Sequence, residues 1–214
     1  MKPTLYLETT IPSYLKARKS RDIIQTARQQ ITAEWWDKRL DDFDIFLSQI
    51  VIDEANEGDP VASAKRMELI KAFPLLEITE EVRDLANVII VGQIIPEKAT
   101  RDALHVAVAT YHEMSFLLSW NCKHIANAEI IKKLQKTIAD EGFELPVICT
   151  PEELLERSQY GRSLDSCHLP GESYKDPADR LIVATARVYG IPLVTRDQKI
   201  RDYEYVETVA GRGL

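Results

Sequence analysis

The sequence predicts an α/β protein built on a central parallel sheet of about five strands flanked by helices. Short apolar runs alternate along the chain with longer segments of helical periodicity, and this alternation is typical of a parallel sheet covered on both faces. Polar or acidic residues follow several of the apolar runs. Because sites in such sheets form beyond the carboxyl ends of the strands, these residues are candidates for function.

The elements follow from local patterns. Amphipathic spacing of Ile24, Ala27, Ile31 and Trp35 predicts a helix over about 21–40, with Trp35 in the core. The apolar runs predict strands at 4–7, 44–47, 75–78, 116–119 and 147–149. Further helices are expected at 48–57, 59–72, 79–91, about 126–141 and from 150, opened by the capping residues Ser48, Asp59, Thr79 and Thr150.

The segment 100–109, TRDALHVAVA, predicts a buried helix with the carboxylate of Asp102 in its first turn. An aspartate there is either a helix cap or part of a site. The pattern recurs at 179–186, DRLIVATA, and the following segment 116–121, FLLSWN, matches 192–197, PLVTRD. The chain therefore contains one unit and a partial copy of its second half.

The partial copy suggests how the chain is divided. We expect a domain at 1–158, a polar linker at 159–173, and the half-repeat at 174–214 with strands at 191–195 and 205–209. The half-repeat is too short to form a stable core alone.

Composition narrows the classes of protein that fit. The chain of 214 residues has 45% hydrophobic and 29% charged residues, and a net charge of −7 argues against a surface that binds nucleic acid everywhere. Three scattered cysteines predict no disulfide framework, and no apolar run reaches membrane length, so we expect a cytoplasmic protein. A zinc site would need an unusual spacing of its donors, which would be Cys122, His124, Cys167 and His168.

Four polar residues are expected to meet at the carboxyl edge of the sheet: Glu8, Glu54, Asp102 and Asn121. Three converging carboxylates need a cation to stay ionised, and oxygen ligands suit Mg²⁺ or Mn²⁺. The alternatives are a strand-end residue for Glu8 and a solvated helix face for Glu54, which lies between Asp53 and Glu57.

Four segments in order resemble the motifs of a PIN domain, closest to the VapC-like toxins of bacterial type II toxin–antitoxin modules. They are 5–11, LYLETTI; 48–55, SQIVIDEA; 102–107, DALHVA; and 119–121, SWN, so the resemblance covers about residues 3–156. It implies a three-layer PIN-like fold, a Mg²⁺- or Mn²⁺-dependent endoribonuclease acting on RNA, a homodimer, and inhibition by a cognate antitoxin.

By that resemblance Glu8, Glu54 and Asp102 are metal ligands, and all four predicted site residues are catalytic. Glu8 stands where the family usually has aspartate, and the glutamate side chain is longer by one methylene. Asn121 stands where the family often has another aspartate, and the asparagine side chain carries no charge.

The half-repeat resembles the second half of a PIN domain. Asp179, Thr195 and Asp197 match that half, but no first half accompanies them. The segment is a fusion remnant, or completes a site with another chain, or replaces the equivalent half of the first unit and supplies Asp197 in place of Asn121.

Arg101 and Lys123 flank site positions and are candidate substrate-binding residues, since cations contact phosphates. Two other functions stay open beside the ribonuclease. One is a non-catalytic binding or assembly module on the same fold, and the other is a nuclease that acts on DNA or structured nucleic acid.

Overall fold

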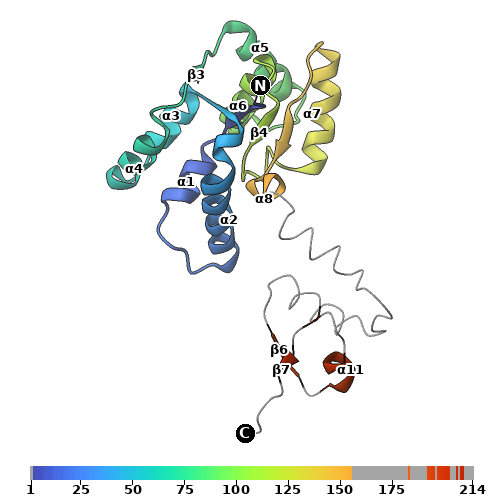
Figure 1. The fold of residues 1–214 in the computed structure, drawn as a ribbon. Helices are drawn as coiled ribbons and strands as arrows, with labels where there is room; N and C mark the ends of the chain where they lie inside the picture. The colour runs from blue at the N-terminus through green and yellow to red at the C-terminus, as the bar shows by residue number, and fades with distance from the viewer. Residues whose placement is uncertain are drawn as a thin grey trace. The chain divides into compact units, whose positions relative to one another are not determined.

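The computed structural model of the chain describes residues 2–155, 183, 192–195, 197–202, 206 and 208–209. Its internal contacts divide the chain into two compact units, Met1–Leu155 and Glu156–Leu214. The first unit holds a parallel sheet with helices packed around it (Figure 1). The predicted linker at 159–173 lies outside the described residues.

The sheet of the first unit has five strands, all parallel, in the order β3-β2-β1-β4-β5. The strands are β1 (Thr4–Leu7), β2 (Asp44–Ser48), β3 (Leu75–Leu76), β4 (Phe116–Leu118) and β5 (Val147–Cys149). This sheet and its flanking helices confirm the predicted α/β class. The chain builds outward from β1 to β3 and then crosses to β4 on the other side, so the strand order reverses between β1 and β4. Ligands of open parallel sheets bind at such a reversal.

The helices agree closely with the predicted ranges. They are α1 (Thr10–Lys16), α2 (Ile23–Arg39), α3 (Gln49–Asn56), α4 (Pro60–Ile70), α5 (Glu80–Val91), α6 (Thr100–Tyr111), α7 (Ala128–Asp140) and α8 (Pro151–Leu154), with short 3₁₀ turns at Leu40–Asp42 and Glu97–Ala99. Their starts follow from capping chemistry. Asp59 accepts the N–H of Ala62 (2.9 Å) with Pro60 at the first helical position, and the Glu153 carboxylate accepts the N–H of Thr150 (2.8 Å).

The predicted cap at Ser48 is wrong in its chemistry. Ser48 does stand at the N-cap position of α3, but its side chain makes no capping hydrogen bond. Its hydroxyl instead pairs with the phenol of Tyr6 (2.6 Å), inside the protein. The Ser48 hydroxyl therefore hydrogen-bonds to the buried phenol of Tyr6 instead of to the backbone at the start of α3.

The core lies on both sides of β1 and along α6. Leu5, Tyr6 and Leu7 are fully buried, and α6 is buried over most of its length, as its apolar sequence predicts. Trp35 is fully buried as predicted, while Trp36 packs edge-on against both Trp35 and Phe73. Each large apolar side chain buried in this way contributes about 1.5–3 kcal/mol, which holds the sheet and α6 in a fixed relation.

The described part of the second unit contains a parallel pair of short strands, β6 (Leu193–Val194) and β7 (Thr208–Val209), and the helix α11 (Gln198–Arg201). The strands fall inside the predicted ranges 191–195 and 205–209. Val183 and Ile200 are buried together in a small apolar cluster. Within the described residues of both units, no helix combines the length and the apolar character needed to cross a membrane.

Candidate metal centre

Glu8 comes directly after β1, at the reversal of strand order. Its N–H donates to the carbonyl of Leu118 (3.1 Å) and so continues the pairing of β1 with β4. One carboxylate oxygen, Oε2, accepts the backbone N–H of Thr10 (3.1 Å), the Thr10 hydroxyl and the Ser119 hydroxyl (2.8 Å). Glu8 is only 4% exposed, so these donors fix its side chain in the interior.

Burial raises the pKa of Glu8 above its ordinary value. The charge of nearby His105 and the three hydrogen bonds act in the opposite direction but do not cancel the effect of burial. A buried carboxylate with a raised pKa gains most from a cation beside it, because the cation offsets the cost of its charge.

Glu54 reaches the same place from α3, the helix that follows β2. Its Oε2 accepts the Thr9 hydroxyl and lies 3.1 Å from Nε2 of His105. Partial burial acts to raise the pKa of Glu54, but the hydrogen bond and charge of His105, the Thr9 hydroxyl and the charge of Arg101 together lower it. Glu54 is therefore an ionised ligand candidate, with 18% of its side chain exposed.

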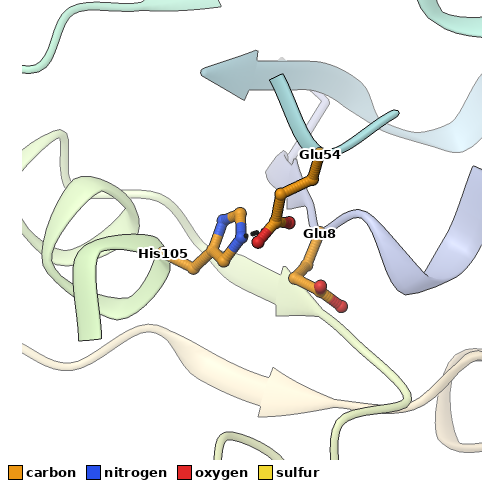
Figure 2. A group of neighbouring side chains, drawn as sticks. All are labelled: Glu8, Glu54 and His105. Atoms are coloured by element: carbon orange, nitrogen blue, oxygen red, sulfur yellow. Dashed lines mark hydrogen bonds and ion pairs between the residues drawn. The ribbon is translucent and has the colours of Figure 1, made fainter. Parts of the chain in front are cut away.

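His105 completes the group from α6, where its side chain is fully buried. Burial acts to lower its pKa, but the hydrogen bond to Glu54 and the charges of three carboxylates together raise it. Figure 2 shows Glu54 and His105 directed toward each other, with the side chain of Glu8 beside them. Their ligand atoms all lie within 4.8 Å of one another, and such a group could hold a metal ion.

Asp102 and Asn121 take part in a second arrangement centred on His124. Asp102 lies in the first turn of α6, and its Oδ2 is 2.7 Å from Nδ1 of His124. It is not the helix cap, because the N-cap position is Ala99 and no side chain caps there. Asn121 Oδ1 accepts the backbone N–H of His124 (3.0 Å) and so holds the turn after β4.

The structure therefore brings together only part of the predicted quartet. Within the described residues, the group that could hold a metal contains Glu8 and Glu54 with His105, and Asp102 is not a member of it. The two arrangements are nevertheless continuous. The Ser119 hydroxyl donates to Glu8 and accepts the N–H of Asn121 (2.9 Å), whose side chain holds His124.

The other candidate residues lie around these groups. Arg101 is half exposed and pairs with Glu57 (2.6 Å), and the same nitrogen is 3.9 Å from Glu54. Lys123 is exposed, in the turn that carries His124. Cys122 is exposed with Arg28 beside its thiol.

Two predicted groups fall largely on residues that the structure does not describe. The zinc set includes Cys167 and His168, which lie outside the described residues, as does Asp179 of the half-repeat. In the second unit the hydroxyl of Thr195 accepts the N–H of Asp197 (3.1 Å), a turn at the start of α11.

Several residues of the site were not anticipated. His105 and Tyr6 form the buried side of the centre, Thr9, Thr10 and Ser119 orient its carboxylates, and His124 binds Asp102. Two signals were present in the sequence. His105 follows Asp102 by three residues, which places both on one helix face, and Tyr6 in β1 precedes Glu8 by two, which is the spacing of residues on one side of an extended chain.

No protein-family model matches the chain, and no curated protein matches it either. The fold and the geometry define a coarse class: a parallel α/β domain with a buried carboxylate–imidazole group, able to hold a cation, where the strand order reverses.

Proposed function

We propose that the first unit is a PIN-like, Mg²⁺- or Mn²⁺-dependent endoribonuclease of the VapC-like toxin type. The observation on which this depends is the convergence of Glu8 and Glu54 beside His105 at the reversal of strand order. Two buried carboxylates close together repel each other, and a cation between them would offset this repulsion. The ordered sequence motifs add the resemblance to this family.

The residues suit hydrolysis of a phosphodiester. Glu8 and Glu54 would hold a divalent cation, which supplies a Lewis acid for the phosphate and lowers the pKa of a bound water. Thr9 and Thr10 fix the two carboxylates through their hydroxyl groups, so the ligands are oriented before a cation binds. Arg101 is exposed beside Glu54, where its charge can contact a phosphate of the substrate.

The proposed partners come from the same resemblance. RNA is the proposed substrate, with a homodimer as the active form and a cognate antitoxin as its inhibitor. The toxin role predicts that regulated expression arrests bacterial growth and that the Glu54→Gln variant does not. If the wild-type chain cleaves RNA in solution but does not arrest growth, the ribonuclease activity stands and the toxin role is excluded.

A second candidate function is a PIN-like binding or assembly module without turnover. The observation in its favour is that Asn121 carries no charge and uses its Oδ1 in a turn, while Asp102 is engaged by His124. If this second function is right, the protein binds its partner but cleaves no RNA with any divalent metal.

The deciding experiment measures cleavage of labelled RNA and of single-stranded DNA of the same sequence with Mg²⁺ or Mn²⁺. We expect the Glu54→Gln variant to lose at least about 100-fold in rate, since it removes a metal-binding charge. The matched control is Asp53→Asn, because Asp53 is the adjacent exposed carboxylate, accepts a hydrogen bond from Gln49 (2.8 Å) and is outside the group that could hold a metal. Equal losses of rate in both variants, or no cleavage by the wild type, would contradict the proposed ribonuclease activity. Faster cleavage of DNA than of RNA would make DNA the proposed substrate.

A further inference from the structure

His105 presents a ring nitrogen to the two carboxylates of the proposed centre. We infer that His105 is the third protein ligand of the metal, through Nε2, and that it makes the centre prefer Mn²⁺ and similar transition ions over Mg²⁺. The inference rests on the proposed function only in requiring a cation at Glu8 and Glu54. It adds an imidazole to a set for which the sequence predicts oxygen ligands alone.

The geometry of the nitrogen supports direct ligation. Nε2 of His105 and Oε2 of Glu54 are 3.1 Å apart. Donor atoms in neighbouring positions around one ion are about 3 Å apart, because bonds to such ions are about 2.1 Å long. The ligand atoms of Glu8, Glu54 and His105 all lie within 4.8 Å of one another, so one ion can reach all three with small adjustments.

The other ring nitrogen is held as a metal-binding histidine requires. Nδ1 of His105 is 2.8 Å from the phenol oxygen of Tyr6, which is 2.6 Å from the hydroxyl of Ser48. All three side chains are buried. Histidine ligands almost always donate their second N–H to such a partner, which fixes the ring orientation and the tautomer. Both hydroxyls can donate or accept, so this chain of contacts can support Nδ1–H.

The third oxygen ligand expected from the sequence is used elsewhere. Asp102 pairs with His124 at 2.7 Å and is outside the group that could hold a metal. Among the described residues, the acidic and imidazole donors of this group are then two carboxylates and one imidazole. Mg²⁺ favours oxygen ligands alone, whereas first-row transition ions accept imidazole readily, so the donor set selects against Mg²⁺.

The competing role for His105 is positioning, in which Nε2 keeps its proton and donates it to Glu54 in the loaded protein. The two roles differ in the tautomer. Without a metal, Nε2 carries a proton and donates it to Glu54. As a ligand, Nε2 has no proton and Nδ1 carries one. The N–H at Nδ1 then donates a hydrogen bond to the Tyr6 phenol, whose own O–H donates to Ser48.

The first test uses the wild-type full chain and the diamagnetic ion Zn²⁺. Histidine ¹H–¹⁵N correlation spectra report which ring nitrogen of His105 is protonated before and after titration. The proposal expects Nε2 to carry a proton before binding and to lose it on binding, with a proton on Nδ1 in the loaded protein. Protonated Nε2 at saturation would overturn the ligand role while leaving the metal centre, and absence of any Zn²⁺ or Mn²⁺ binding would overturn the centre itself.

The second test compares metal affinities by titration calorimetry. His105→Gln is expected to weaken Mn²⁺ binding at least about tenfold and Mg²⁺ binding by less than about threefold. The matched control is His112→Gln, because His112 is at the far end of α6 and pairs with the carbonyl of Glu77 (2.8 Å). Equal losses for Mn²⁺ and Mg²⁺ in a folded His105 variant would contradict the selectivity, and if that variant does not fold, the spectra of the wild type decide alone.

Discussion

Two carboxylate–imidazole pairs flank α6, and their surroundings differ. The inner pair, Glu54 and His105, is 3.1 Å apart with the ring fully buried, and the outer pair, Asp102 and His124, is 2.7 Å apart with both side chains partly exposed. The helix supplies the imidazole to one pair and the carboxylate to the other. The inner pair is enclosed by Tyr6 and Thr9. Similar chemistry is thus found in a buried group that could hold a cation and in a pair that is partly exposed to solvent.

The comparison predicts its largest effect on stability at Glu8, which lies beside the inner pair. In the metal-free protein, Glu8→Ala should lower the free energy of unfolding by about 2–4 kcal/mol, because it leaves the buried donor of Ser119 and the partly buried donors of Thr10 without an acceptor. Glu8→Gln keeps an oxygen acceptor and removes a charge that burial disfavours, so its loss should be less than about 1 kcal/mol. Urea denaturation measures both. Equal losses would show that these donors find other partners.

The inner position should also give the metal-free protein a characteristic dependence on pH. The pKa of Glu8 is raised in the folded state by burial, so the folded protein binds this proton more tightly than the unfolded chain. Its contribution to stability is therefore fully present below the ordinary glutamate pKa of about 4.3 and is lost as the pH rises through the folded-state value.

Thermal unfolding of the wild type and of Glu8→Gln across this pH range isolates the effect of that one group. The stability of the wild type should fall relative to the variant as the pH rises, and saturating Mn²⁺ should restore it only in the wild type. A difference between the two proteins that does not change with pH would contradict the raised pKa.

The outer pair should tolerate change better. Asp102→Asn and His124→Gln each remove one member of a pair that is 19% and 15% exposed, so each should cost only about 1 kcal/mol of stability. We expect RNA cleavage to fall about tenfold in each, against at least about 100-fold in Glu54→Gln. Single-turnover rates compare the three. If Asp102→Asn were as damaging as Glu54→Gln, Asp102 would be a metal ligand in the loaded enzyme, as the sequence predicts.

The elements of this fold were predictable because each has a local cause. Short apolar runs gave the five strands, and Asp59, Thr79 and Thr150 mark helix starts through contacts within a few residues. Two metal-ligand candidates, Glu8 and Glu54, were also predictable, since a position at a strand end or on the following helix is fixed by the topology of a parallel sheet.

The partners of the site were not predictable, because they depend on long-range packing. His105 lies in an apolar helix and could have been an ordinary core residue. Its role follows from Tyr6 and Glu54, which are 99 and 51 residues away in the chain. The engagement of Asp102 by His124 likewise depends on the turn after β4.

The smallest predicted effect concerns Arg101, which lies at the solvent side of the inner pair. Arg101→Gln should change stability by less than about 1 kcal/mol, because the guanidinium is half exposed and its pairing with Glu57 is at the surface. Removing this charge beside Glu54 should tighten Mn²⁺ binding slightly, since the arginine and a cation compete for the same carboxylate. The substitution should also weaken RNA binding. If Arg101 contacts a phosphate, the slope of the logarithm of the binding constant against the logarithm of the salt concentration should decrease in magnitude by about one.

Fluorescence titrations of a labelled RNA at several salt concentrations measure this slope. The matched control is Arg83→Gln, because Arg83 is an exposed arginine on α5 and should leave the slope unchanged. If both variants left it unchanged, Arg101 would act only through its ion pairs with Glu54 and Glu57, and the substrate would approach the inner pair along a different surface.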